Sequence, residues 1–296
     1  MTAGARRRDG AAAAGAVTAA AAATIEVDAG PVAVRHRLAL AVRPLDARTT
    51  APAAGLRVGY EAPHPGGAVR PLENHGASGW VLRHGPGGIR GRSVLLRLDD
   101  PARRLVPRRL RVPLWALDEL TGADDRPPTA GYVPAASRLL RPWLLPGAAY
   151  PVTGGLTGLR LRVTLGGRPV RWPRVEAFGA GGVRIGWAHG DQFGQVLLLV
   201  DGIGGLPHPP PSALDVALRT AVPDPAHPPP VDPRDPLADL VVEEVARSHA
   251  PPAPGDLDNP VLRGVAAPPG YRTATRDAVR SLTVGRVLPE TDLPHG

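Results

Sequence analysis

The feature of this sequence that most constrains its fold is a period-two alternation of apolar and polar residues. From Val32 to Arg43 the even positions carry most of the large apolar side chains, and the odd positions carry Arg and Ala. The stretch Leu56–Glu61 alternates in the same way. Successive side chains of a β-strand point to opposite faces, so each stretch predicts a strand with one buried and one solvated face.

Further strands are expected where this alternation returns between clusters of Gly, Pro and Asp, which supply turns. The expected strands are Trp80–Arg83, Ser93–Leu98, Arg109–Leu114, Leu159–Leu165, Pro169–Phe178, Val183–His189 and Gln195–Asp201. The last four follow one another through tight turns, which indicates an antiparallel sandwich or half-barrel. The fold class predicted is mainly β, with two antiparallel β-sandwich-like domains and a Pro-rich tail with short helices.

The same reading divides the chain into five segments. They are an Ala- and Arg-rich leader (1–23), a first β domain (24–114), a connector (115–154), a second β domain (155–204) and a Pro-rich tail (205–296). The connector opens with an expected short helix at Trp115–Thr121. The stretch Arg138–Leu145 is cut by Pro142, so we expect it to pack as an irregular clasp.

The tail holds 19 of the 37 prolines. Capping residues and apolar spacing predict three helices in it, at Ser212–Ala221, Asp235–Val245 and Thr273–Leu282. Short amphipathic helices joined by stiff Pro-rich spacers cannot build a core alone. We therefore expect them to dock on the β domains or on a partner protein.

The leader has the outline of a signal peptide, with Arg6–Arg8 ahead of Ala11–Ala23. Its apolar stretch is nearly all Ala, which is a weak signal core. A disordered leader and a cytoplasmic protein are therefore expected, and secretion is the alternative if the leader acts as a weak signal. No stretch approaches the ~18 consecutive apolar residues of a membrane-spanning helix.

The charge of the chain is uneven. All 35 basic residues are Arg, which a GC-rich bacterial genome explains. Residues 24–113 hold 15 Arg against 7 acidic residues, whereas residues 205–296 hold 8 Arg against 12. Such asymmetry can mark a nucleic-acid surface. Here, however, the Arg alternate with apolar residues instead of clustering with aromatic ones, which is typical of a solvated strand face, so nucleic acid is disfavoured as a partner.

Composition and spacing exclude several kinds of chemistry. The chain has no Cys, which excludes a disulfide scaffold, a thiolate metal site and a cysteine nucleophile. None of the nine His has the spacing of a zinc protease, and no Ser lies in a Gly-x-Ser-x-Gly elbow. We therefore expect no enzyme, no metal and no cofactor.

A few residues remain as weak ligand-binding candidates. His189 and Asp191 are two positions apart, so both would lie on one face of a strand, although Asp191 is equally explained by turn chemistry. Trp172 and Trp187 lie on neighbouring expected strands and could stack on a sugar, although five Trp and two Phe are also needed as core. Arg90 and Arg92, in a Gly-rich loop, are anion-binding candidates; without a P-loop ending, a flexible hairpin is the simpler reading.

Residues 155–201 resemble the carboxypeptidase-regulatory-like (transthyretin-like or Cna-B-like) β-sandwich domain. The likeness is carried by Leu161–Val170 (LRVTLGGRPV), Pro173–Ala177 (PRVEA) and Gly186–Leu198 (GWAHGDQFGQVLL). They follow that family's order of strand, Gly-x-Pro-Val turn, strand and Asp-x-x-Gly hairpin. The sequence departs from the pattern where Trp172-Pro173 replaces a small Gly-Ala pair and His189-Gly190 replaces the usual Thr. Residues 24–114 would be a diverged repeat of the same unit.

Domains of this kind are structural spacers, adhesive modules or accessory parts of larger assemblies, and the resemblance implies no chemistry of their own. The function expected is therefore a non-enzymatic structural or adaptor protein of a multi-protein assembly, such as a phage-tail-like or secretion apparatus. Its protein partner would bind through residues 205–296. Two alternatives stay open, a carbohydrate- or surface-binding β-sandwich module and an enzyme with an unfamiliar site.

Overall fold

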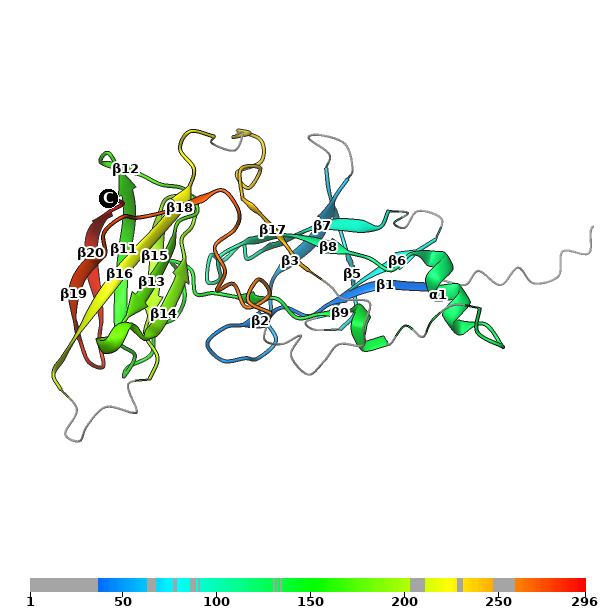
Figure 1. Ribbon diagram of the computed structural model, residues 1–296, viewed down its shortest axis with the longest axis horizontal. Coiled ribbons are helices and arrows are strands. Elements are labelled where there is room, and N and C mark those ends of the chain that lie inside the picture. Colours follow the sequence, from blue (N-terminus) through cyan, green and yellow to red (C-terminus); the bar gives the residue numbers. More distant parts are fainter. Residues whose placement is uncertain are drawn as a thin grey trace, which may run out of the picture. The chain divides into compact units, whose positions relative to one another are not determined.

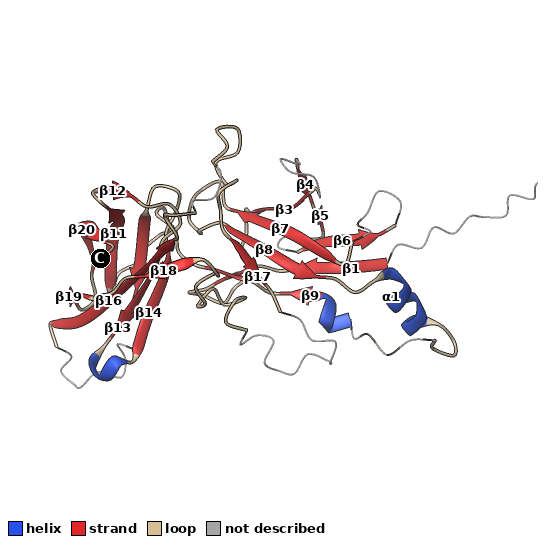
Figure 2. Cartoon of the chain, turned by 45° about the horizontal axis from the view of Figure 1, so that its top comes forward, coloured by secondary structure: helices blue, strands red, loops and turns tan. Residues whose placement is uncertain are grey.

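The computed structural model describes residues 37–62, 68–76, 79–85, 89, 91–129, 131, 133, 135–202, 211–227, 231–246 and 259–296. The expected leader (1–23) and the start of the first expected strand lie outside these residues. The described chain is mainly β, as the alternation predicts (Figure 2). Within it, no helix is long and apolar enough to cross a membrane.

A first core, here called the N-terminal lobe, is built from two main sheets. One has the order β5-β6-β1-β9 and the other the order β17-β8-β7-β3-β4. The strands of the first sheet are β5 (Glu73–Asn74), β6 (Trp80–His84), β1 (Arg37–Val42) and β9 (Leu139–Leu140). Those of the second are β17 (Val242–Glu244), β8 (Arg108–Pro113), β7 (Ser93–Asp99), β3 (Arg57–Glu61) and β4 (Val69–Pro71).

Residues 115–154, expected as a connector, contain one helix and short strands, and their strands β9 and β10 (Trp143–Leu144) pair with β1 and β2 (Leu45–Asp46). Helix α1 (Leu117–Asp124) lies two to three residues later than predicted, and the Glu119 carboxylate accepts a hydrogen bond from the Ala116 N–H at 2.7 Å. A 3₁₀ turn, η1 (Ala135–Arg138), precedes β9. Strand β10 then pairs in parallel with β2.

A second core, here called the C-terminal lobe, again joins two sheets. The first contains β15 (Gln195–Leu199), β12 (Arg168–Pro169), β11 (Gly158–Leu165) and β20 (Val287–Pro294). The second contains β14 (Arg184–His189), β13 (Arg174–Phe178), β16 (Ala213–Pro223), β18 (Tyr271–Thr273) and β19 (Ala278–Thr283), and the 3₁₀ turn η2 (Ala180–Gly182) joins β13 to β14. Isolated bridges between β14 and β15 connect the two sheets along one side.

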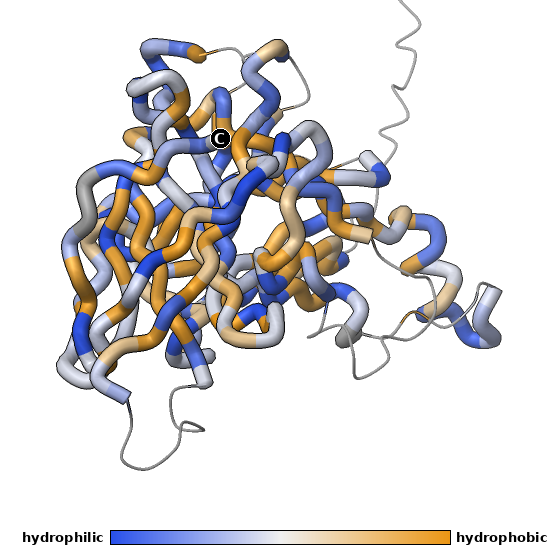
Figure 3. The backbone as a smooth tube through the Cα atoms, turned by 60° about the vertical axis from the view of Figure 1, so that its left-hand side comes forward, coloured by the Kyte–Doolittle hydropathy of each residue, from blue (hydrophilic) through white to orange (hydrophobic). Residues whose placement is uncertain are grey.

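The alternation explains which side chains fill each core. On β8, Leu110 and Val112 are fully buried while Arg111 is exposed. On β11, Leu159, Leu161 and Val163 all lie in the second core. Figure 3 shows hydrophobic and hydrophilic positions alternating along the strands. Burial of one face per strand is thus the main source of stability.

The three helices expected in the tail are wrong. Residues 212–221 form most of β16, residues 235–245 form turns followed by β17, and residues 273–282 run from the end of β18 through β19. These segments form strands because neighbouring strands of the sheets need hydrogen-bonding partners. β13 needs a partner on the side away from β14, and β11 needs one on the side away from β15. β16 and β20 supply them (Figure 1).

The described residues after 204 therefore complete both lobes and do not form a separate tail. β16 pairs with β13 over five residues, and β20 runs parallel to β11. β17 pairs in parallel with β8 of the N-terminal lobe. The boundary expected at residue 204 cuts through the second lobe's sheets.

Candidate functional site

A concave site of about 780 Å³, here called the cleft, lies beside strands β3 and β4. Its apolar wall comes from the N-terminal lobe and from residues 236–237, and includes Val58, Leu72, Trp80, Leu105 and Leu237. Edge strand β4 contributes Val69 and Pro71. Among the described residues, β4 pairs with β3 alone, so its other edge is open.

Most of the charged groups that line the cleft have structural partners. The Asp100 carboxylate accepts hydrogen bonds from the backbone N–H groups of Ala102, Arg104 and Leu105 at 3.0–3.1 Å. Asp235 accepts a hydrogen bond from Arg97 at 2.6 Å. These carboxylates hold turns and neighbouring segments in place, so they are not free to bind a ligand.

Asp99 and Arg57 are different. They are directly opposed on β7 and β3, and both line the cleft. In the part of the chain that the structure describes, neither side chain makes a hydrogen bond or a close ion pair. Burial raises the pKa of the Asp99 carboxyl, and the nearby Arg57 opposes that shift without cancelling it. The cleft therefore offers one carboxyl group and one exposed guanidinium to a ligand.

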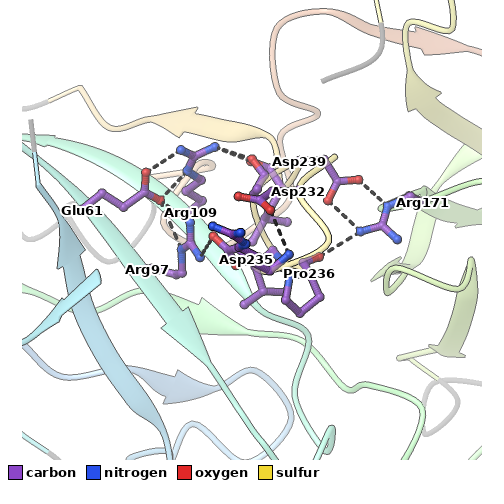
Figure 4. Close-up of polar contacts among 12 residues, drawn as sticks. Glu61, Arg97, Arg109, Arg171, Asp232, Asp235, Pro236 and Asp239 are labelled. Carbon is purple, nitrogen blue, oxygen red and sulfur yellow. Dashed lines mark hydrogen bonds and ion pairs between the residues drawn. The ribbon is translucent and has the colours of Figure 1, made fainter. Parts of the chain in front are cut away.

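One end of the cleft is held by a network of ion pairs around residues 232–240, here called the linker loop (Figure 4). The Glu61 carboxylate accepts hydrogen bonds from Arg97 at 2.8 Å and from Arg109 at 2.5 Å. Burial opposes ionisation of Glu61, but the hydrogen bonds from the two Arg prevail and lower its pKa. Arg97 also holds Asp235, which ties the loop to the N-terminal lobe.

The other side of the linker loop is held by the C-terminal lobe. Arg171 donates to the Asp239 carboxylate at 2.7 Å and to the Pro236 carbonyl at 2.9 Å (Figure 4). Asp239 is 4% exposed, so this ion pair is partly shielded from solvent. Residues Asp235 and Leu237 of the loop in turn line the cleft.

A buried ion pair lies between β8 and the last third of the chain. Arg108 and Glu243 are 0% and 1% exposed, and their side chains meet through two hydrogen bonds at 2.9 and 2.6 Å. Arg108 also donates to the carbonyls of Trp143 and Leu262 at 2.8 Å. The interpretation of the strand Arg as a solvated face holds for Arg111 but is wrong for Arg108.

A second, smaller pocket of about 80 Å³ lies on the face of the β13–β14 sheet that points away from its core, here called the Arg174 pocket. Arg174 and His189, directly opposed on β13 and β14, both line it. Arg174 is 6% exposed and His189 0%. The segment Gly264–Ala267 forms another part of its wall.

The structure separates the sequence-predicted residues His189 and Asp191. His189 lines the Arg174 pocket, whereas Asp191 lines the cleft. Asp191 accepts hydrogen bonds from the N–H groups of Phe193 and Gln195 at 2.9 and 3.0 Å, which is the turn chemistry expected of it. It also accepts one from Arg103 at 2.6 Å, a contact that the sequence did not suggest.

The two Trp candidates are buried to different degrees. Trp172 is 1% exposed and has a φ of 58°, a left-handed backbone conformation in which a bulky residue is rare. It stands where the resembled family commonly has a small pair. Trp187 is half-buried, lines the Arg174 pocket and has the Arg184 guanidinium 5.4 Å from its ring centre. Neither presents an open stacking surface for a sugar.

The anion-binding candidates Arg90 and Arg92 stay a prediction. Arg90 lies outside the described residues, and Arg92 is exposed, with its carbonyl accepting the Leu114 N–H. Within the described residues, no cluster of three or more His, Asp or Glu side chains is arranged to hold a metal ion.

Sequence reasoning missed Arg57, Asp99, Arg108, Arg174 and Glu243. One signal was available for Arg108, which continues the even-numbered register of Leu110 and Val112 and so had to face the core. A charged residue at a buried strand position requires a partner of opposite charge. That partner, 135 residues away, cannot be found from spacing.

Comparison with known proteins assigns no family. No family model matches the chain, and no curated protein matches it. A solved structure, the Bacillus anthracis TIE protein, aligns with 86% of this chain at 8% identity and a TM-score of 0.21. The chain covers 33% of that protein, and similarity this weak carries no argument about fold or function.

Proposed function

We propose that this chain is a non-enzymatic adaptor protein of a multi-protein assembly, and that the cleft docks an extended segment of a partner protein. The observation that carries the proposal is an apolar wall beside two opposite charges, Asp99 and Arg57, whose side chains make no hydrogen bond within the described residues. Apolar area supplies affinity, and charges that are not held by internal hydrogen bonds supply selectivity.

An extended segment fits this cleft for a further reason. Edge strand β4 contributes Val69 and Pro71 to the wall and leaves one edge open within the described residues. An open strand edge can pair with an added strand through main-chain hydrogen bonds. The volume of the cleft alone would also suit a small molecule.

Of residues 205–296, which the sequence predicts to bind a partner, we propose that only the linker loop takes part. The strands of this region are paired in the two lobes, but the linker loop contributes Asp235, Pro236 and Leu237 to the cleft. We therefore assign to this region one wall of the docking surface. We do not assign it a free binding tail.

The structure supports the two alternative functions, a carbohydrate-binding module and an enzyme, less well. A carbohydrate-binding module needs an exposed Trp platform, and Trp172 is buried while Trp187 lies in a small pocket. An enzyme needs convergent titratable groups, and three of the cleft's four carboxylates are held by structural hydrogen bonds. A lone carboxyl beside an Arg is not a complete acid–base pair.

The test exchanges the two charges, Arg57→Asp with Asp99→Arg, in the tagged full-length protein. Because the residues face each other, the exchange keeps their mutual attraction while reversing what a partner meets. Partners recovered from the native host should be lost, and cross-linking of the wild type should place a partner peptide at the cleft. The matched control exchanges the exposed pair Arg111 and Glu244.

Three results would contradict the proposal. They are an unchanged partner set with the cleft exchange, equal loss with the control exchange, and the absence of any partner for the wild type. Circular dichroism and thermal denaturation of both variants check that each remains folded.

A further inference from the structure

Two residues that line the Arg174 pocket, Arg174 and His189, have buried polar atoms that make no hydrogen bond, although Arg174 Nη2 lies 3.7 Å from the Glu243 carboxylate. The Nε and Nη2 atoms of Arg174 and the Nδ1 atom of His189 are buried and make no hydrogen bond. The Nη1 atom of Arg174 has only long contacts, at 3.5 Å, with the carbonyls of Trp172 and Pro173. Buried polar atoms are rarely left unpaired, so these require an explanation.

The state of His189 follows from its other nitrogen. Nε2 lies 2.7 Å from the carbonyl oxygen of Gly264. A carbonyl can only accept, so Nε2 carries the hydrogen and donates it. Burial, together with the charges of Arg174 and Arg108, lowers the pKa of His189 well below its usual value. The ring is therefore neutral, and its Nδ1 atom is an unused acceptor.

The charges around the pocket do not balance. Glu243 lies 2.6 Å from Arg108 and 3.7 Å from Arg174, so one buried carboxylate faces two buried guanidinium groups. The other charges in reach are paired: Glu176 with Arg184, Arg219 with Asp277, and Arg171 with Asp239. An excess buried positive charge is costly unless an anion neutralises it.

The geometry of the atoms that lack hydrogen bonds indicates which kind of anion would fit. Nε and Nη2 lie on one edge of a guanidinium, which matches two oxygens of a carboxylate or phosphate-like group. The Nδ1 acceptor needs a donor, so the ligand must also carry an O–H. A volume of about 80 Å³ holds roughly five to eight water-sized centres, which is room for a five-atom oxyanion.

We propose that the Arg174 pocket binds a small oxyanion that carries a proton, of the hydrogen phosphate class, with two oxygens on Arg174 and its O–H donated to His189 Nδ1. Ordered water alone would satisfy the atoms but would leave the buried charge uncompensated. The site is distinct from the cleft, and neither proposal depends on the other.

The test uses the full-length protein and inorganic phosphate as the probe, with sulfate and chloride at matched ionic strength as comparisons. Sulfate has the same shape as phosphate but no proton near neutral pH. Phosphate should therefore raise the melting temperature in a saturable way, and titration calorimetry should show one site per chain. Sulfate and chloride should do so much less.

Two variants test whether the phosphate that stabilises the protein binds in the Arg174 pocket. Arg174→Lys keeps the charge but loses the paired donors, so phosphate should bind about tenfold more weakly or worse. His189→Leu removes the acceptor and should abolish the preference for phosphate over sulfate. Arg162→Gln, at an exposed ion pair on β11, is the control and should bind phosphate like the wild type.

The proposal is overturned if phosphate stabilises the wild type no more than sulfate or chloride, or if Arg174→Lys binds it with unchanged affinity. Should either pocket variant fail to fold, hydrogen exchange of the wild type decides. Phosphate must then slow exchange at β13 and at Gly264–Ala267, and slowing elsewhere alone would refute the assignment.

Discussion

At the level of single residues, the most informative side chains are charged groups that the fold buries. Arg108, Arg174 and Glu243 are each less than a tenth exposed, although charged residues are rarely buried without partners. Each lies on a strand, so its direction is set by the register of its neighbours. Where the side chain points inward, it needs a partner of opposite charge, because an uncompensated buried charge is strongly destabilising.

Removing the partner of Arg108 should destabilise the protein strongly. Glu243→Gln leaves a buried guanidinium uncompensated, and we expect a loss of about 3–5 kcal/mol in the free energy of unfolding. The control is the next residue, Glu244, whose ion pair with Arg111 is exposed. Glu244→Gln should cost about 1 kcal/mol or less in urea denaturation. Equal losses for the two variants would mean that the buried pair is not formed.

His189 should make stability depend on pH. Its folded pKa is lowered by burial first and by Arg174 and Arg108 next, so below about pH 6.5 the unfolded chain takes up a proton that the folded chain does not. Stability should be flat above that pH and fall below it, by up to about 1.4 kcal/mol per pH unit. His295, whose pKa burial also lowers, adds to the same slope.

The measurement is urea denaturation between about pH 7.5 and pH 5.5, a window set by the usual His pKa. His189→Leu should reduce the slope of the unfolding free energy against pH by the contribution of one proton. His295→Asn should reduce that slope by less. A slope that is the same in the wild type and in His189→Leu would rule out a buried neutral imidazole.

At the element scale, the sequence was most informative where the alternation was strict. β3, β6, β7, β8, β11, β14 and β15 lie at or within a few residues of the predicted strands. β16 was mistaken for a helix because Ser212 and Asp215 resemble a capping box. In fact Val216, Leu218 and Val222 are buried on alternate positions. Local signals for helix and strand were balanced there, and pairing with β13 decided the outcome.

The site was less predictable than the fold. Asp191 as a turn residue follows from the local sequence, and so does the use of Trp172 as core. The cleft and the Arg174 pocket, however, join residues from segments far apart, such as Asp99 with Leu237 and Arg174 with Gly264. Spacing in a single sequence carries no information about such contacts.

The last strand should be as important to the second core as any other. Leu293 on β20 is 0% exposed, so Leu293→Ala should cost about 2–5 kcal/mol in the free energy of unfolding. Leu165 on the neighbouring strand β11 is 37% exposed, and Leu165→Ala is the matched control, expected within about 0.5 kcal/mol of the wild type. Similar small effects for both would show that β20 is not docked.

At the scale of the whole molecule, residues 211–296 connect the two lobes. β17 belongs to the N-terminal lobe, and β16, β18, β19 and β20 belong to the C-terminal lobe. The linker loop is held by Arg97 on one side and by Arg171 on the other. The described residues from 37 to 296 therefore belong to one compact unit, and the partner surface that we propose is the cleft instead of a free tail.

Hydrogen exchange with mass spectrometry on the full-length protein tests directly whether the strands of residues 211–296 are part of the two lobes. If residues 211–296 complete both lobes, amides of β16, β19 and β20 should exchange as slowly as those of β11 and β13, because central strand amides open only with the whole core. Fast exchange throughout 211–296, with β11 and β13 still protected, would contradict the account and restore the free tail as the partner-binding region.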